Sequence, residues 1–373
     1  MVKIVINALQ YKKNSSGIGV MIRALFGPYT RIAGHLCQII LPIDAPAFPA
    51  GERAECIRVA CKYGQSVRRM FFQTFRLGPR YCQDAVLLTT DSKMPLLLPK
   101  NCVAVPLITD LAVYRMKEAY QLSRVLWWRL QYWFVRRRAN FYLTISEFTR
   151  QEMVKIWGIP VEKIHIVPCA CSVEMRRVDK VEKLDALRKK YALPEHFLLF
   201  VGNFNPRKNL ERLMRAYDRA RDSGKVAHQL VIAGEQGWKF DKQTALKGIA
   251  HQDDIRFIGF VPDEDMAALY SAADAFLFPT LYEGFGIPVI EAQSCGTPVL
   301  TSNVSSLPEV GGDAAVYVDP YDVEDICDGI VKITGDASLA QELRQKGYEN
   351  AKRFSWEKSA EILREVIERE VMR

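Results

Sequence analysis

The chain has 373 residues, of which 49% are hydrophobic and 25% charged, and this balance excludes a disordered or fibrous protein. The length predicts two domains, each with its own apolar core. The nine cysteines lack paired CxxC spacing, so we expect free thiols, with neither a zinc site nor disulfide bonds. No apolar run reaches the roughly 20 residues that span a bilayer, and the first segment lacks the apolar region of a signal peptide, which predicts a cytoplasmic protein.

The positive charge is confined to the first half of the chain. Residues 1–172 carry 24 Lys+Arg and 10 Asp+Glu, a net charge of +14, whereas residues 173–373 carry 27 and 33, a net charge of −6. A basic field of this kind attracts anionic lipids, nucleic acids or phosphorylated substrates before any specific contact forms.

Short apolar segments in the first half alternate with helical or basic ones, which predicts a parallel sheet covered by helices. The predicted strands are 2–7, 37–43, 85–90, 102–108 and 141–146. A loop with Gly17 and Gly19 joins the first strand to a helix over 20–29, and small residues there let backbone amides approach a phosphate or an acceptor hydroxyl. Ile22 stands where a dinucleotide fingerprint requires a third glycine, so a nicotinamide-dependent oxidoreductase is not expected.

Aromatic and basic residues are interleaved in segment 124–138, and segment 62–80 has a similar composition. The aromatic residues are Trp127, Trp128, Tyr132, Trp133 and Phe134, beside Arg124, Arg129, Arg136, Arg137 and Arg138. One interpretation is that the aromatic rings pack against the first domain while the arginines are solvated. A second is an interfacial helix on anionic lipid. Stacking on nucleic-acid bases is a third, but no nucleic-acid-binding module accompanies the segment.

The second half contains another series of α/β elements. Segment 178–194 is charged and poor in strands, which predicts a domain boundary, and strands then follow at 197–203, 229–234, 255–260, 275–280, 298–302 and 315–318. Helices are predicted over 209–222 and 263–274. We therefore predict an α/β protein of two Rossmann-like, doubly wound domains, residues 1–172 and 173–373. The last helix, 355–373, has Ser355 as its N-cap and could return to the first domain.

A glycine turn after strand 275–280 indicates an anion site. Gly284 and Gly286 let the backbone approach a ligand, and a helix that begins near Pro288 directs its first amides and its dipole toward that point. Glu283 and Glu291 flank this helix start, and both could accept hydrogen bonds from sugar hydroxyls. The alternative is that the two carboxylates only stabilise the helix N-terminus.

A second anion signal follows strand 197–203. Arg207 and Lys208 lie at the carboxyl end of that strand, where open α/β sheets bind ligands, and together they suit a diphosphate. We expect this loop to lie two strands away from the glycine turn. Taken alone, a turn with this sequence is more often a solvated loop than a binding site.

Three segments resemble the GT-B-fold glycosyltransferases of family 4, namely 144–168, 202–213 and 259–310. The most specific motif is the pair Glu283 and Glu291, with seven residues between them. The resemblance implies a retaining transferase that uses a nucleotide sugar in a cleft between two Rossmann-like domains, usually without a metal or other cofactor. It further implies that Arg207 and Lys208 hold the diphosphate, Glu283 the sugar hydroxyls and Glu291 the ribose. The backbone amides of Gly284, Phe285 and Gly286 would complete the phosphate cradle.

The chain also departs from the family pattern. It reads Thr109-Asp110 where many members have His-Asp, so Asp110 alone keeps an active-site role there. Asn203 replaces an arginine, which leaves more of the charge compensation to Arg207. Cys169-Ala170 replaces the usual Asn-Gly.

From these residues we expect transfer of a hexose-type sugar, with mannose favoured, from a nucleotide diphosphate sugar to a hydroxyl of a glycan or lipid-linked acceptor. The alternative within the fold is a nucleotide-sugar epimerase or hydrolase, and a nucleic-acid-binding protein is more distant. The basic first half predicts peripheral binding to an anionic membrane surface, at the inner face of the cell membrane.

Overall fold

The computed structural model describes residues 2–12, 17–90, 94–237 and 240–371. The chain forms two compact units, one of Met1–Cys169 with Ser355–Arg373 and the other of Ala170–Phe354. The boundary thus lies three residues before the expected one, and the last helix returns to the first unit, as the sequence allowed. It does so because its apolar face packs on the first helix and Ser359 Oγ donates to the carbonyl oxygen of Pro168 at 2.7 Å.

The first unit contains a seven-stranded parallel sheet in the order β3-β2-β1-β4-β5-β6-β7. The strands are β1 (Lys3–Asn7), β2 (Leu36–Pro42), β3 (Ala54–Val59), β4 (Ala85–Thr90), β5 (Val103–Ile108), β6 (Tyr142–Thr144) and β7 (Ile164–Ile166). The five predicted strands are confirmed. The sequence did not predict the two edge strands, because β3 carries exposed polar residues such as Glu55 and β7 is only three residues long.

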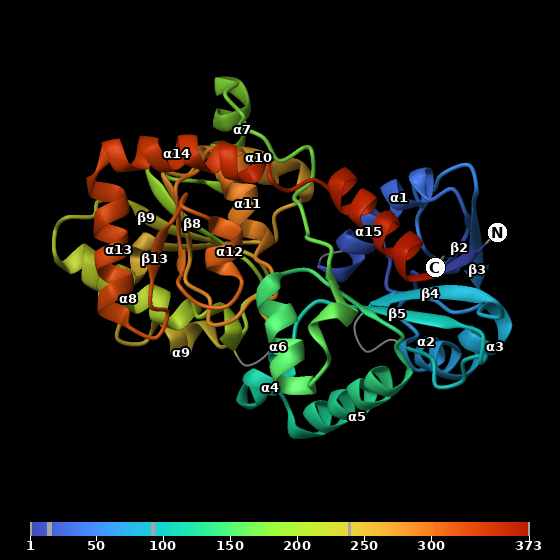
Figure 1. The fold of residues 1–373 in the computed structure, drawn as a ribbon. Coiled ribbons are helices and arrows are strands. Elements are labelled where there is room, and N and C mark those ends of the chain that lie inside the picture. Colours follow the sequence, from blue (N-terminus) through green and yellow to red (C-terminus); the bar gives the residue numbers. More distant parts are fainter. Residues whose placement is uncertain (1, 13–16, 91–93, 238–239, 372–373) are drawn as a thin grey trace. The chain divides into compact units, whose positions relative to one another are not determined.

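Helices cover both faces of this sheet, so its central strands are buried and almost continuously apolar. The helices are α1 (Ile18–Ile32), α2 (Ser66–Phe71), α3 (Leu77–Tyr81), α4 (Ala112–Arg115), α5 (Leu122–Arg138), α6 (Glu147–Trp157) and α15 (Trp356–Val371), with a π-helical turn η1 (Phe72–Arg76) and 3₁₀ turns η2 (Lys117–Ala119) and η3 (Val161–Lys163). In Figure 1, α1 and α15 lie together on one face and α2, α3 and α5 on the other. Leu98 packs against the apolar clusters of both α3 and α5.

The second unit has a six-stranded parallel sheet in the order β10-β9-β8-β11-β12-β13. Its strands confirm the predictions: β8 (Phe197–Val201), β9 (Gln229–Ala233), β10 (Ile255–Gly259), β11 (Ala275–Phe278), β12 (Val299–Ser302) and β13 (Val316–Val318). The helices are α7 (Val181–Tyr191), α8 (Leu210–Asp222), α9 (Lys242–Leu246), α10 (Asp263–Ala272), α11 (Ile287–Ser294), α12 (Leu307–Gly311), α13 (Val323–Gly335) and α14 (Ala337–Ala351), with 3₁₀ turns η4 (Pro206–Lys208) and η5 (Gln252–Asp254). Helix α8 packs on α13, and α11 on α14 (Figure 1).

Strand order places the two predicted anion loops side by side. Strands β8 and β11 are direct neighbours, so the loop with Arg207 and the glycine turn leave the same sheet edge one strand apart, not two as expected. Among the described residues, no helix combines the length and the apolar character needed to cross a bilayer.

Candidate active site

The loop after β8 is shaped by two asparagines. Asn205 Oδ1 accepts a hydrogen bond from the backbone N–H of Arg207 at 3.1 Å, which starts the η4 turn. Asn209 has a φ of 58°, a left-handed conformation that asparagine tolerates better than most residues. Its Nδ2 donates to the carbonyl oxygens of Pro279 at 2.9 Å and Pro320 at 2.7 Å. One side chain therefore ties the Arg207 loop to the segments that follow β11 and β13.

A backbone hydrogen bond joins the same two loops, from the Leu281 N–H to the Arg207 carbonyl oxygen at 2.9 Å. The glycine turn is held from its other side by Ser306, whose Oγ lies 2.9 Å from the Glu283 carbonyl oxygen and 2.8 Å from that of Phe285. The Glu283 N–H donates to Ser305 Oγ at 3.1 Å. The turn predicted to contact phosphate is thus fixed by a backbone hydrogen bond on one flank and by two serine side chains on the other.

Gly286 ends the turn and begins α11. Its φ is 106°, a backbone conformation that favours glycine, and a Cβ built there would lie 2.7 Å from Leu307 Cδ2, so a larger residue would also displace the Leu307 side chain. Pro288 occupies the first turn of α11, as predicted. Helix starts of this kind present backbone N–H groups and the positive end of the helix dipole, which favour an anion.

Lys208 and Glu283 form a buried ion pair. Lys208 Nζ lies 2.8 Å from Glu283 Oε1, and the two side chains are only 11% and 9% exposed. The ammonium also lies 4.4 Å from the centroid of the Phe278 ring. Burial lowers the pKa of Lys208 despite the attraction of Glu283. Burial raises the pKa of Glu283, but the charges of Lys208 and Arg207 outweigh this and hold it below its ordinary value.

Glu291 is paired with a tyrosine. The Tyr270 hydroxyl donates to Glu291 Oε2 at 2.9 Å. Burial raises the pKa of Glu291 to about 7, although the hydrogen bond from Tyr270 opposes the shift. Its carboxyl group therefore changes charge near neutral pH. The assignment of this residue to the donor ribose stays a prediction.

The remaining predicted site residues belong to the first unit. Gly17 is exposed, has a φ of 57° and precedes α1, while Gly19 is buried in the first turn of that helix. The preceding loop residues 13–16 lie outside the described part. Asp110 follows β5, and its Oδ1 accepts from the Ala112 N–H at 3.0 Å at the start of α4. Each of these residues follows a strand at the carboxyl edge of the first sheet, where α/β folds bind ligands.

Sequence reasoning missed four residues that shape the site of the second unit. They are Asn209, Tyr270, Ser305 and Ser306. The Ser305-Ser306 pair between a strand and a helix was a visible signal, because hydroxyls at such junctions commonly bind neighbouring backbone. Tyr270 gave no signal, since it reads as an ordinary apolar position of a helix.

The aromatic-basic segment forms α5, which has two apolar faces. Val125, Tyr132 and Val135 are buried against the first sheet, whereas Leu122, Leu126 and Leu130 are 73%, 58% and 49% exposed at helical spacing on another face. Trp127 and Trp133 are also exposed, as are Val67, Met70, Phe71 and Phe75 in the helical stretch 66–81. The packing interpretation is therefore confirmed for one face of the helix, and the interfacial interpretation stays a prediction for the exposed face.

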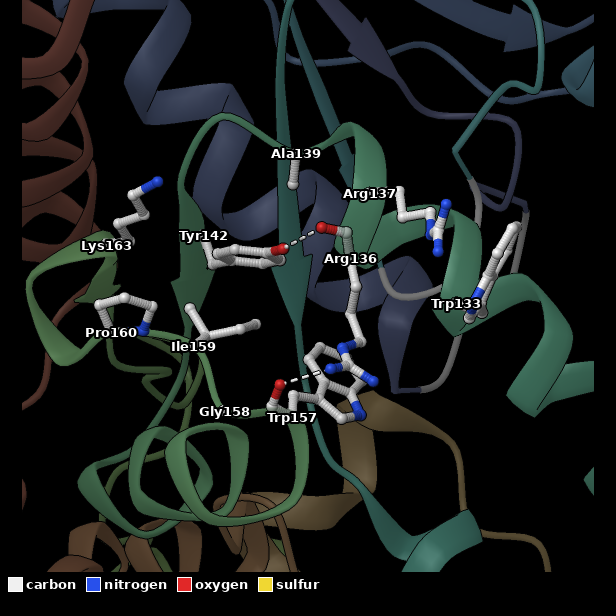
Figure 2. A pocket seen from close by; sticks show the side chains of 10 residues that line it. All are labelled: Trp133, Arg136, Arg137, Ala139, Tyr142, Trp157, Gly158, Ile159, Pro160 and Lys163. Carbon is white, nitrogen blue, oxygen red and sulfur yellow. Dashed lines mark hydrogen bonds between the residues drawn. The ribbon is translucent and has the colours of Figure 1, made fainter.

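The end of α5 lines a cavity of about 370 Å³ (Figure 2). Arg136 Nη2 donates to the Trp157 carbonyl oxygen at 2.5 Å, and the Arg137 guanidinium carbon lies 4.1 Å from the centroid of the Trp133 ring. Lys163 adds a third cation from the opposite side, and none of the lining residues is acidic. The cavity is suited to an anionic group beside an aromatic surface.

Comparison with known proteins identifies the family. The model for glycosyl transferases group 1 matches residues 185–354. Over 256 residues the chain is 36% identical to the O-antigen chain mannosyltransferase B of Escherichia coli, a match that covers 68% of this chain and 67% of that protein. A serotype-specific mannosyltransferase, WbdA of Escherichia coli, is 33% identical over 230 residues, which are 60% of this chain but 28% of that protein.

A solved structure shares the fold. Sucrose-phosphate synthase from Thermosynechococcus elongatus superposes with a TM-score of 0.74 over 99% of both chains, at 19% sequence identity. The two Rossmann-like units are those of a GT-B fold. The chain belongs to the glycosyl transferases group 1 and is a glycosyltransferase.

Proposed function

We propose that the enzyme transfers a mannosyl group, with retention at the anomeric carbon, from a nucleotide diphosphate sugar to a hydroxyl group of a glycan or lipid-linked acceptor. The observation that carries the proposal is the convergence of Arg207, Lys208 and Glu283 beside the N-terminus of α11. Two relatives that share about a third of the aligned residues are named mannosyltransferases. Their names support mannose as the sugar, although the aligned part covers only a fraction of the second relative.

The donor would bind beside Lys208 and Glu283, which form an ion pair with each other in the structure. Lys208 has three N–H donors, so its contact with Glu283 leaves the ammonium able to donate to a phosphate oxygen as well. Arg207 and the first turn of α11 would hold the remaining phosphate charge. Glu283 would accept hydrogen bonds from sugar hydroxyls, Glu291 from the ribose, and Asp110, Gly17 and Gly19 would serve the acceptor side.

The proposed reaction needs no protein nucleophile. The acceptor oxygen attacks the anomeric carbon on the face that the diphosphate leaves, so the new C–O bond forms as the old one breaks and configuration is kept. The departing diphosphate takes the acceptor proton. Arg207, Lys208 and the helix dipole stabilise the charge that develops on the leaving oxygen, which is electrostatic catalysis by groups already in position.

Product analysis tests the proposal directly. The enzyme is incubated with GDP-mannose and lipid-linked or glycan acceptors, and the anomeric configuration of the product is read by NMR. An α-linked mannoside is expected from the α-linked donor. An inverted linkage would overturn the retaining mechanism. Mannose release without transfer, or isomerisation of the donor alone, would instead establish a hydrolase or an epimerase. A thermal-shift screen of GDP, UDP, ADP and dTDP sugars identifies the base, and GDP-mannose is expected to stabilise the protein most.

We also propose that the enzyme binds to an anionic membrane surface through its first unit. The first unit, as the structure defines it, carries 28 Lys+Arg against 15 Asp+Glu. The exposed apolar residues of α5 and of 66–81 lie on helices that cover the same face of the first sheet. Apolar side chains flanked by arginines are typical of helices that lie in the headgroup region. Such binding would bring the enzyme to lipid-linked acceptors.

A further inference from the structure

Three metal-ligating side chains meet in the second unit, far along the strands from the candidate active site. His196 directly precedes β8, His228 directly precedes β9 and Asp274 directly precedes β11. One ligand atom from each lies within 4.8 Å of the other two. Because the sheet is parallel, these residues stand at its amino edge, whereas Arg207 and Glu283 follow the carboxyl ends of the same strands.

The sheet itself brings the three residues together. Strands β9, β8 and β11 are consecutive neighbours in the sheet order. Phe197 pairs with Gln229, so the histidines that precede them are also adjacent across the two strands. Leu198 pairs with Ala275, which sets Asp274 beside Phe197. Neighbouring strands lie about 4.8 Å apart, so the cluster is fixed by register and does not depend on a loop.

The distances suit a single ion after small side-chain rotations. His196 Nδ1 lies 3.4 Å from Asp274 Oδ1, and His228 Nε2 lies 3.8 Å from Asp274 Oδ2. Zinc binds imidazole nitrogen and carboxylate oxygen at about 2.0–2.2 Å, and tetrahedral ligands are then about 3.3 Å from one another. The carboxylate is already oriented, because Asp274 Oδ2 accepts from the Phe197 N–H at 2.8 Å. The His196 side chain is 66% exposed and free to turn.

The electrostatic surroundings also allow a cation. Asp274 supplies a carboxylate between the two imidazoles, and its oxygens lie within 3.4 Å of His196 Nδ1 and 3.8 Å of His228 Nε2. A cavity of about 390 Å³ opens beside the cluster and leaves room for a water ligand. Among the described residues, three arginines also line this cavity: Arg177 is paired with Asp179, Arg188 is paired with Asp185, and Arg344 donates to the Gly296 carbonyl oxygen at 2.8 Å.

We propose that His196, His228 and Asp274 form a binding site for a divalent transition metal of the zinc class, with water as the fourth ligand. Two imidazoles and one carboxylate are a donor set that such ions prefer over Mg²⁺ or Ca²⁺. The ion would cross-link the starts of three neighbouring strands, at the sheet edge opposite the candidate active site. Its role is therefore to stabilise the second unit, and it takes no part in the transfer reaction.

Metal titration of the full chain tests the site. The protein is stripped with a chelator and titrated with Zn²⁺ and Co²⁺, with calorimetry, the visible spectrum of Co²⁺ and the melting temperature as readouts. One equivalent is expected to bind and to raise the melting temperature, and Mg²⁺ to have no such effect. Replacement of His196 or His228 by Ala is expected to lower affinity more than about 10-fold. Because the His196 side chain is exposed, its replacement by Ala is not expected to disturb folding.

His251 provides the matched control. Its Nε2 lies 2.9 Å from Asp222 Oδ1 and its Nδ1 3.9 Å from Asp254 Oδ2, so it has two carboxylates but no second imidazole. His251→Ala is expected to bind the metal like the parent. The proposal is overturned by an absence of saturable binding, by equal weakening in His251→Ala, by unchanged binding in His196→Ala, or by a thiolate-to-cobalt charge-transfer band that identifies cysteine ligands.

Discussion

Lys208 Nζ and Glu283 Oε1 lie 2.8 Å apart although 75 positions separate the two residues in the chain. The cation predicted to hold phosphate and the carboxylate predicted to hold sugar hydroxyls are therefore partners. Both follow neighbouring strands of one parallel sheet, so the sheet edge, and not a flexible loop, sets their separation. A ligand that binds there meets groups whose orientation is already fixed.

Removal of one member of this pair should destabilise the protein strongly. Lys208→Ala leaves a buried carboxylate without its partner, and we expect a loss of about 3–5 kcal/mol in the free energy of unfolding. The double variant with Glu283→Ala should lose less than the sum of the two single variants, because neither charge is then left alone. Urea denaturation of the four proteins measures the coupling. Additive losses would mean that the pair does not interact energetically.

Arg207 and Glu283 should affect different steps of the reaction. Arg207→Ala removes a charge-assisted contact to the diphosphate, and we expect about 10–150-fold weaker binding of both the donor and the free nucleoside diphosphate. Glu283→Gln should mainly lower turnover. Calorimetry with the nucleoside diphosphate separates the two, and Arg215→Ala, an exposed arginine of α8, is the control. If Glu283→Gln weakened nucleoside diphosphate binding while Arg207→Ala mainly lowered turnover, the two assigned roles would have to be exchanged.

The raised pKa of Glu291 should make stability depend on pH. Because the folded-state pKa is about 7 and the ordinary value 4.5, the folded protein holds this proton more tightly than the unfolded chain. The stabilisation is complete below pH 4.5 and is lost as the pH rises through 7. Glu291→Gln should therefore gain stability relative to the parent at pH 8 but not at pH 4, by up to about 3 kcal/mol. Glu264→Gln, an exposed residue of α10, should show no such difference. A parallel pH profile for Glu291→Gln and the parent would contradict the assigned shift.

Asn209 should be a structural requirement of the site. Asn209→Ala removes the donor to two buried carbonyl oxygens and places an alanine in the left-handed region, so we expect a loss of about 2–4 kcal/mol in the free energy of unfolding. Asn209→Gly relieves the backbone strain but not the lost hydrogen bonds. It should be about 1 kcal/mol more stable than Asn209→Ala. Equal stability of the glycine variant and the parent would show that the bridge to Pro279 and Pro320 contributes nothing.

Membrane binding should require both charge and exposed apolar surface on α5. Arg137 and Arg138 are exposed, and their joint replacement by Ser should weaken binding to anionic vesicles about 30-fold at low salt, at about 1 kcal/mol for each charge. Arg136 is left in place because it bonds to the Trp157 carbonyl. Leu126 and Leu130 replaced by Ser should weaken binding at all salt concentrations. Co-sedimentation measures both effects.

Arg215 and Lys225 of the second unit, both exposed, are the charge-matched control, and their joint replacement by Ser should leave sedimentation unchanged. Equal binding to neutral and anionic vesicles would rule out the electrostatic contribution. Binding that survives the change of Leu126 and Leu130 at high salt would rule out the apolar one.

Much of this protein was determined by local sequence. The apolar strands were predicted because buried parallel strands are almost continuously hydrophobic, and the start of α11 was predicted because Gly286 and Pro288 meet local backbone demands that few other residues meet. The positions of Arg207 and Lys208 at a strand end likewise follow from the chain alone.

Only the tertiary structure decided which of these residues meet. Strand order made β8 and β11 neighbours, and this alone pairs Lys208 with Glu283 and lets Asn209 reach two other loops. The sequence of α5 could not show which apolar face is buried and which is exposed, because both faces carry large apolar residues. The physical reason is the same for the Lys208–Glu283 pair, the Asn209 contacts and the two faces of α5. The partners of a side chain depend on which distant segments the sheet brings beside it, and a local sequence pattern does not contain that information.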